Sequence, residues 1–320
     1  YVYDCFGEEE GKKKGYPGHE IAEMALMRLY DVTGEEKYRR LAEFFINQRG
    51  TRPYYFDEEH PEVVKKGHEN ELRYFYHQAH LPVREQDEAF GHSVRAVYLY
   101  SGMADVARVD DDDALYEACL KLWNNVTQKK MYVTGGIGAT HLGEAFSFNY
   151  DLPNDTAYSE TCAAIGLVFF ARRMLEIKPD RSFSDVMERA LYNTVLAGMA
   201  ADGKSFFYVN PLEVYPKACH EDARKFHVKP IRQKWFGCAC CPPNIARLLS
   251  SLAMYAYTEN EDTLFAHLFV GGSVKKDVNG KELSFEVTTD MPWQGTTVYS
   301  CTNEQSVHGS LAIRIPCLLY

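Results

Sequence analysis

The chain has 320 residues, of which 46% are hydrophobic and 13% aromatic, enough for a large hydrophobic core and too many for a disordered protein. Its net charge of -10 would repel phosphate backbones, and no basic face interleaved with aromatics is visible, so nucleic acid is excluded as a partner. No apolar stretch approaches the roughly 20 residues that span a bilayer, so no membrane insertion is expected. Without a signal-like start we expect a cytoplasmic protein; because the chain begins at Tyr1, a removed leader and export stay open.

Apolar residues return every three or four positions from about residue 19 to residue 257, which predicts a mainly helical region. The first two helices form a hairpin that is interrupted at Gly34, a residue typical of helix C-caps. Five further helices are predicted over residues 92–107, 114–127, 161–177, 183–199 and 244–257. Repeated helical pairs with aromatic residues favour a barrel of paired helices, although a bundle or a solenoid fits the same pattern.

The pattern changes after residues 258–262, where alternation replaces helical spacing. Leu283, Phe285 and Val287 share one face of a predicted strand, and Asn279-Gly280 before it is a strong hairpin signal. A further strand pattern follows at residues 311–315. We therefore expect a helical (α/α) barrel catalytic domain over residues 1–260 and the beginning of a β-sandwich domain over residues 261–320.

Two segments between predicted helices, 132–159 and 206–243, are long and rich in Gly, Asp, Asn and Pro. Loops longer than about 12 to 15 residues are uncommon in compact domains and are more often functional than idle. The chemistry of the protein is therefore expected in these two segments.

The cysteines give the strongest chemical signal. Their number is nine, and an odd count without regular spacing argues against a disulfide scaffold. Five are scattered and are interpreted as small buried hydrophobes or idle thiols: Cys5, Cys119, Cys219, Cys301 and Cys317. Cys238, Cys240 and Cys241, in contrast, lie together directly before two prolines and a predicted helix. Adjacent cysteines seldom bond to each other, so their thiolates suit a soft cation.

A second motif, Glu160-Thr161-Cys162, precedes the predicted helix 161–177. Its first and third side chains share a target only if the backbone is extended or in a first helical turn. Residues typical of helix N-caps come before it: Asp155, Thr156 and Ser159. Together the two motifs supply four ligands of the types that zinc prefers: Glu160, Cys162, Cys240 and Cys241. Because their spacing matches no standard zinc-finger formula, a redox cysteine pair and buried inert thiols stay open beside a metal site.

The glycine-rich loop 134–146 contains Glu144. Its glycines do not follow the dinucleotide-binding spacing, so a phosphate-binding loop is rejected. A lone loop glutamate is usually a solvated charge. Glu144 lies among glycines and aromatics near a predicted metal ligand, however, which favours a raised pKa and an acid role.

Five short motifs, taken in chain order, resemble glycoside hydrolase family 127, whose best-known member is a β-L-arabinofuranosidase. They are YVTG at 132–135, GEAF at 143–146, DLPND at 151–155, ETC at 160–162 and FGCACCP at 236–242. The resemblance covers nearly the whole chain and implies an (α/α)6 barrel followed by β-sandwich domains. About seven barrel helices are visible, so we expect the N-terminal helices of the barrel to be missing from this sequence.

The resemblance also implies residue roles. Cys240 would be the nucleophile and Glu144 the general acid/base, while Cys238 has no ligand role. Zn²⁺ would be the cofactor, bound by Glu160, Cys162, Cys240 and Cys241. The sugar subsite would be lined by His19, His92 and Tyr208. Judged from the residues alone, His92 could equally cap its helix and Tyr208 could equally belong to the core.

The function implied is that of a retaining glycoside hydrolase that releases L-arabinose from β-L-arabinofuranosides. Its partner would be a carbohydrate containing L-arabinofuranoside, and a homodimer fits the acidic surface. Two alternatives stay open at this stage. One is a sugar isomerase or epimerase on a similar helical barrel, and the other is a non-catalytic sugar-binding protein with a structural zinc.

Overall fold

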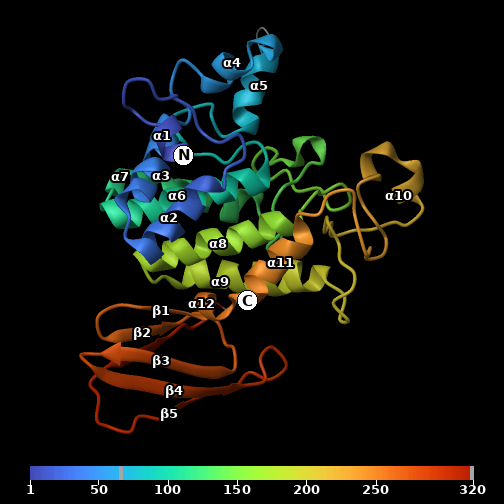
Figure 1. The fold of residues 1–320 in the computed structure, drawn as a ribbon. Coiled ribbons are helices and arrows are strands. Elements are labelled where there is room, and N and C mark those ends of the chain that lie inside the picture. The colour runs from blue at the N-terminus through green and yellow to red at the C-terminus, as the bar shows by residue number, and fades with distance from the viewer. Residues whose placement is uncertain (65–67, 318–320) are drawn as a thin grey trace.

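The computed structural model describes residues 1–64 and 68–317, which form a mainly helical region followed by small β-sheets, in the predicted order (Figure 1). The helices are α1 Val2–Cys5, α2 Ala22–Thr33, α3 Glu36–Gln48, α4 Tyr55–Glu59, α5 His68–Tyr76, α6 Ser93–Asp110, α7 Asp113–Asn125, α8 Thr161–Ile177, α9 Arg181–Ala190, α10 Ala218–Glu221, α11 Cys241–Ser250 and α12 Ala253–Ala256. In these two described stretches, no helix is both long and apolar enough to cross a membrane.

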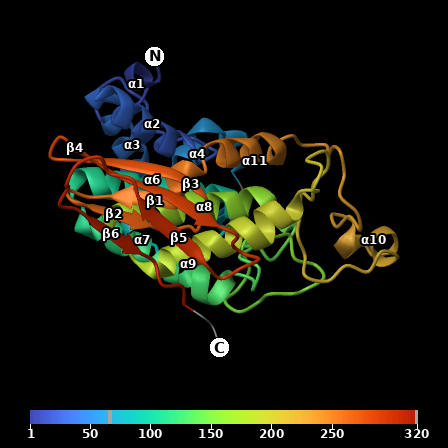
Figure 2. The ribbon, with the colours of Figure 1, turned by 90° about the horizontal axis from the view of Figure 1, so that it is seen from below.

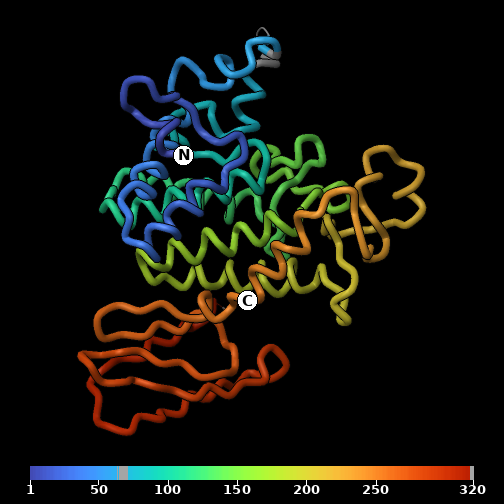
Figure 3. The backbone as a smooth tube through the Cα atoms, in the orientation of Figure 1, coloured from blue at the N-terminus to red at the C-terminus, as the bar shows by residue number. Residues whose placement is uncertain are grey.

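Helices α6 and α8 lie at the centre of the helical region, between α2 and α3 on one side and α9 on the other (Figures 1 and 3). Nearly all of α8 is buried, which agrees with a sequence that is apolar around most of the helix. Polar side chains mark two of the helix starts: Asp112 accepts a hydrogen bond from Leu115 N–H at α7, and Asp180 accepts one from Ser182 N–H at α9. The resulting core extends through α6, α7, α8 and α9.

Some helix ends were predicted correctly from neighbouring residues in the sequence, and others were not. Gly34 follows α2 in the left-handed conformation with φ of 69°, so the predicted C-cap is confirmed. The predicted helix 183–199 is shorter than expected, because α9 ends at Ala190 and continues as a π-helical segment, Leu191–Leu196. The predicted helix 244–257 was wrong at both ends. It begins as α11 at Cys241, since proline is well accommodated in a first helical turn, and it breaks before the short α12.

In the described part of the chain, six strands follow, in two three-stranded sheets. Their bounds are β1 Tyr257–Glu259, β2 Thr263–Ala266, β3 Gly272–Val278, β4 Lys281–Thr289, β5 Thr297–Cys301 and β6 Ser310–Ile313. In one sheet β2 pairs antiparallel with β1 and parallel with β6; in the other β3, β4 and β5 form an antiparallel meander. Asn279 and Gly280 both have positive φ, 54° and 78°, as the predicted hairpin turn requires. The division at residue 260 stays a prediction.

The sheets lie against one side of the helical region (Figures 1 and 2). Arg314, whose side chain is almost fully buried, joins the two parts: it forms ion pairs with Asp185, at 2.5 Å, and with Glu188, both on α9. His267 adds a second connection, because its ring nitrogens contact Ser184 of α9 at 3.0 Å and Thr258 of β1 at 2.7 Å. Polar contacts thus fix the sheet of β1, β2 and β6 to α9.

Candidate active site

A pocket of about 640 Å³ lies where three helices begin. The residues directly before these helices all line it: His92 before α6, Glu160 before α8 and Cys240 before α11. Helix N-termini carry a partial positive charge, which stabilises carboxylates and thiolates placed there. The pocket therefore has the size of a small-molecule site, and the helix N-termini around it stabilise ionised carboxyl and thiol groups in its lining.

The two predicted metal-binding motifs meet at this pocket. One ligand atom from each of Glu160, Cys162, Cys240 and Cys241 lies within 4.8 Å of the others. The Cys162 and Cys241 sulfurs are 3.6 Å apart, and Cys240 Sγ lies 3.8 Å from Cys241 Sγ and 3.4 Å from Glu160 Oε1. Glu160 Oε2 is buried and has no hydrogen-bond partner among the described residues. This cluster could hold a metal ion, which would satisfy the second carboxylate oxygen.

Backbone pairing sets the position of Glu160. Thr161 N–H donates to the carbonyl oxygen of Tyr208 at 2.9 Å, and residue 160 forms a bridge with Val209. Glu160 is therefore an extended N-cap with Cys162 in the first helical turn, as expected from their spacing. The expectation that a polar side chain caps α8 was wrong: among the described residues no side chain caps it, and Ser159 Oγ is buried without a partner there. The β-bridge supplies the tertiary support instead.

A negative charge on this cluster is favoured at Cys240. Hydrogen bonds from Cys162 and Cys241 lower the pKa of the Cys240 thiol, and the Tyr208 hydroxyl, 3.1 Å from Cys240 Sγ, lowers it further. The same contacts with Cys240 raise the pKa of Cys162 and contribute to raising that of Cys241. Burial, with the nearby charge of Cys240, raises the pKa of Glu160. Cys240, the half-buried member, is thus the best thiolate among the three.

Glu144 reaches the pocket from the glycine-rich loop. Gly143 and Glu144 both adopt left-handed backbone conformations, with φ of 71° and 53°, which turn the loop sharply at this point. Glu144 Oε2 lies 2.9 Å from His92 Nε2. Since His92 Nδ1 accepts from Val94 N–H, the neutral ring carries its proton on Nε2 and donates it to Glu144. His92 therefore caps α6 and contacts Glu144 at the same time.

The expected raised pKa of Glu144 was wrong for this arrangement. The hydrogen bond from His92 lowers the pKa of Glu144 below its usual range, with a further contribution from the Tyr158 hydroxyl. Glu144, His92 and Glu160 also place one ligand atom each within 4.8 Å of one another. Glu160 thus connects the Glu144–His92 pair to the cysteine cluster.

The three residues predicted for the sugar subsite all line the pocket: His19, His92 and Tyr208. The His19 and His92 rings are 6.1 Å apart, close to edge-on. Tyr208 packs partly against the core and also directs its hydroxyl to Cys240. It therefore belongs to the core and to the pocket lining, the two positions that the sequence left open. Cys238, which is exposed, lines the pocket outside the four-atom cluster.

Three polar lining residues were not predicted as site residues: Tyr98, Asn244 and Arg247. The Tyr98 hydroxyl accepts hydrogen bonds from Asn244 Nδ2 at 2.8 Å and from Arg247 at 3.2 Å. Asn244 and Arg247 follow Cys240 by four and seven positions, so helical spacing placed them on the same face and was the available signal. Tyr98 has no comparable signal, because α6 is buried on nearly all sides.

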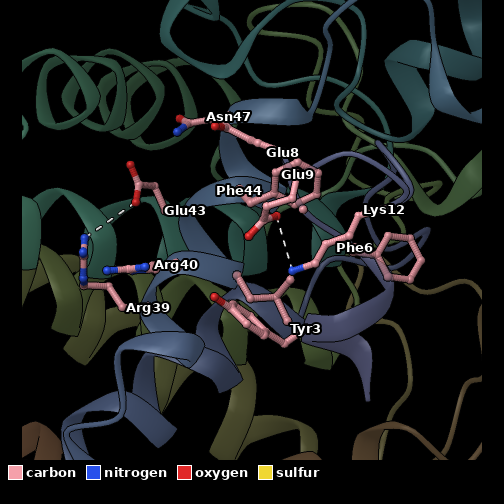
Figure 4. A pocket seen from close by; sticks show the side chains of 12 residues that line it. Tyr3, Phe6, Glu8, Glu9, Lys12, Arg39, Arg40, Glu43, Phe44 and Asn47 are labelled. Carbon is pink, nitrogen blue, oxygen red and sulfur yellow. Dashed lines mark ion pairs between the residues drawn. The ribbon is translucent and has the colours of Figure 1, made fainter.

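A second pocket, of about 460 Å³, lies near the N-terminus against α3 (Figure 4). Its charged side chains neutralise one another: Lys12 pairs with Glu9 at 3.3 Å, and Arg39 with Glu43 at 3.6 Å. Its lining includes no cysteine or histidine. Of these two pockets, only the first is lined by cysteine and histidine.

The chain is similar in sequence and fold to known proteins. The family model "Beta-L-arabinofuranosidase, GH127 catalytic domain" matches residues 1–254. A "non-reducing end beta-L-arabinofuranosidase" of Bifidobacterium longum subsp. longum is 40% identical over 98% of the chain and 49% of that protein. The crystal structure of a GH127 β-L-arabinofuranosidase from Geobacillus stearothermophilus T6 is 50% identical, with a TM-score of 0.94 over 99% of the chain and 50% of that protein. A further solved GH127 β-arabinofuranosidase is 42% identical, with a TM-score of 0.84 over 98% of the chain and 45% of that protein.

The fold is the helical (α/α) barrel of the GH127 catalytic domains that the chain matches. The chain belongs to the GH127 catalytic-domain family. The predicted family and the predicted (α/α) barrel fold class are thereby confirmed. The chain spans about half the length of the relatives it matches, and the homodimer stays a prediction.

Proposed function

We propose that the protein is a retaining β-L-arabinofuranosidase in which Cys240 is the nucleophile and Glu144 the general acid/base. The observation that carries the proposal is the position of Cys240 Sγ. It belongs to the four-atom cluster with Glu160 and also lines the pocket into which the Glu144–His92 pair projects. The relatives described as β-L-arabinofuranosidases support the choice of sugar.

Zinc is the metal that we propose for the cluster. Zinc–sulfur bonds of about 2.3 Å at tetrahedral angles place two sulfurs about 3.8 Å apart. The observed separations of 3.6 Å and 3.8 Å fit this geometry, as does the unpartnered Glu160 Oε2. The donor set, three thiols and one carboxylate, is a zinc-type set.

The reaction follows from the two sides of the pocket. Cys240 Sγ attacks the anomeric carbon while Glu144 donates a proton to the leaving oxygen, and a thioglycoside forms on Cys240. Glu144 then removes a proton from water, which attacks the same carbon and releases the Cys240 thiolate. Two displacements at one carbon retain its configuration. His19, His92 and Tyr208 would hold the sugar between these groups.

When bound, zinc would keep Cys240 a thiolate at neutral pH and require Glu160 to be ionised. Three thiolates and one carboxylate around a divalent ion leave the cluster negative. That negative charge, beside Glu144, would oppose the lowering of its pKa by His92. With zinc bound, the pKa of Glu144 would therefore be higher, and Glu144 would keep the proton that it must donate.

The test compares wild type with C240S and E144Q on a β-L-arabinofuranosyl disaccharide and on the p-nitrophenyl β-L-arabinofuranoside. C240S should lose at least about 10³-fold in kcat on both substrates. E144Q should lose far more on the disaccharide than on the aryl glycoside, because p-nitrophenolate leaves without protonation. C301S, which changes an exposed cysteine of β5 outside the pocket, is the matched control and should keep activity.

The anomer released first is measured by proton NMR. The β-anomer supports retention through Cys240, whereas the α-anomer, or near-native rates in C240S, would refute the assignment. Conversion of a free sugar by a protein indifferent to C240S would favour the isomerase alternative instead. Sugar binding without turnover, unchanged in E144Q, would favour the binding-protein alternative.

A further inference from the structure

The segment that carries His19 lies in a turn before α2 and is held from two sides. On the core side Arg49, which is fully buried, donates to the Pro17 carbonyl at 2.8 Å and to Glu20 Oε1 at 2.8 Å. Those contacts fix the residues on either side of the Gly18–His19 dipeptide. Gly18 and His19 themselves, on the pocket side, are not held by Arg49, and a different residue contacts the Gly18 carbonyl.

That residue is Arg95, which follows His92 by three positions on α6 and therefore lies on the same side of the helix. Arg95 Nη1 donates to the Gly18 carbonyl at 2.7 Å, and His77 Nδ1 lies 2.8 Å from Arg95 Nη1 and 3.1 Å from the same carbonyl oxygen. Arg95 and His77 thus both contact Gly18. Burial first, and then Arg95, lower the pKa of His77 to about 4, so the arrangement persists at neutral pH.

Arg95 also contacts the layer behind His92. Its guanidinium lies 4.9 Å from the centre of the Tyr76 ring. Tyr76 in turn packs edge-on against the His92 ring at 5.8 Å, and its carbonyl accepts from His92 N–H at 3.3 Å. One side chain thus touches both the His19 segment and the support of His92.

We propose that Arg95 is a positioning residue that sets the gap between His19 and His92, and hence the affinity for the sugar. The role rests on the proposed function, because it assigns both histidines to the sugar subsite. Arg95 does not line the pocket, so it acts through them. Since Arg49 anchors the same segment independently, loss of Arg95 should leave the fold intact and release His19.

The first experiment measures kcat and KM for the aryl arabinofuranoside in the zinc-loaded protein. R95M should raise KM about tenfold with a smaller change in kcat, because misplaced binding groups weaken sugar affinity. R95K should recover part of the loss, since an ammonium can still donate to the Gly18 carbonyl. R108M is the matched control on the same helix, where Arg108 pairs with Asp31 at 3.1 Å, and it should leave KM unchanged.

A double-mutant cycle tests whether Arg95 affects sugar affinity through His19. If Arg95 acts through His19, R95M added to H19A should raise KM by less than about twofold. Full additivity of the two changes would overturn the proposal. So would an R95M protein whose KM equals that of wild type.

A second readout does not depend on turnover. Diethyl pyrocarbonate labels neutral histidines, and mass spectrometry gives the rate at each site. R95M should increase labelling of His19 about threefold relative to R108M, because the segment opens locally. If wild type fails to cleave arabinofuranosides but this rate rises, the positioning role stands and the proposed function falls. If wild type is active and the rate is unchanged, the positioning role falls alone.

Discussion

The hydroxyl of Tyr208 lies 3.1 Å from Cys240 Sγ, although the two residues stand at opposite ends of the long segment 206–243. Tyr208 is itself fixed by its carbonyl, which accepts from Thr161 N–H at the start of α8. The contact therefore connects the proposed nucleophile to the segment that carries Glu160. A phenol whose pKa is raised, here by burial first, remains a donor at all relevant pH values and stabilises a thiolate.

Replacing Tyr208 with Phe removes that donor. We expect Y208F to raise the pKa of Cys240, so the pH at which alkylation by iodoacetamide reaches half its maximal rate should rise by about 1, the effect of losing one hydrogen bond to a charged group. Alkylation is followed by mass spectrometry in protein freed of metal. Y150F, which changes an exposed tyrosine, is the control. Identical pH profiles of alkylation in wild type and Y208F would show that the contact does not stabilise the thiolate.

Metal removal should destabilise the protein through the cysteine cluster. A metal that binds the folded state alone raises Tm, so a chelator should lower the Tm of wild type. C162A removes a ligand and should make Tm insensitive to the chelator. C119A is the control, because Cys119 is fully buried in α7 outside the cluster, so this variant should lose stability but keep the chelator response. The prediction fails if C162A and wild type respond equally.

Glu20 should make the protein less stable as pH rises through the weakly acidic range. Burial raises its pKa from 4.5 to about 7, against the opposing effect of Arg49. Between these values the folded carboxyl keeps a proton that the unfolded one has released, so raising the pH favours unfolding, by on the order of 3 kcal/mol across the window. In E20Q the free energy of unfolding should decline less between pH 5 and pH 7, because glutamine does not titrate. Urea titrations of both proteins at pH 5 and pH 7 measure it, and parallel declines would contradict the assignment.

His267 should have the opposite effect. Burial lowers its pKa from 6.5 to about 4, so between these values the unfolded histidine binds a proton that the folded one does not. Stability should therefore rise with pH through this window and level off above it, by on the order of 3 kcal/mol. H267Q cannot titrate and should be less sensitive to acid than wild type. His77 and His80 titrate in the same direction, so only the difference between the two proteins is diagnostic.

Local signals in the sequence were sufficient wherever a few neighbouring residues decide the structure. Gly34 ended a helix and Asn279-Gly280 formed a hairpin turn, because both depend on the left-handed conformation that these residues tolerate. Helix ends near residues 190 and 250 were misplaced, since a π-helical segment and a break before β1 depend on packing rather than on local propensity.

The sequence by itself determined the family, the helical class and the types of side chain that could bind a soft metal. Only the tertiary structure decided that Cys162 and Cys241, 79 positions apart, place their sulfurs in contact. It also decided that His92 lowers the pKa of Glu144 and that Arg95 reaches Gly18. The chemistry of a side chain follows from the identity of one residue. Distances between remote segments depend on how the buried helices pack, and this packing involves the whole core at once.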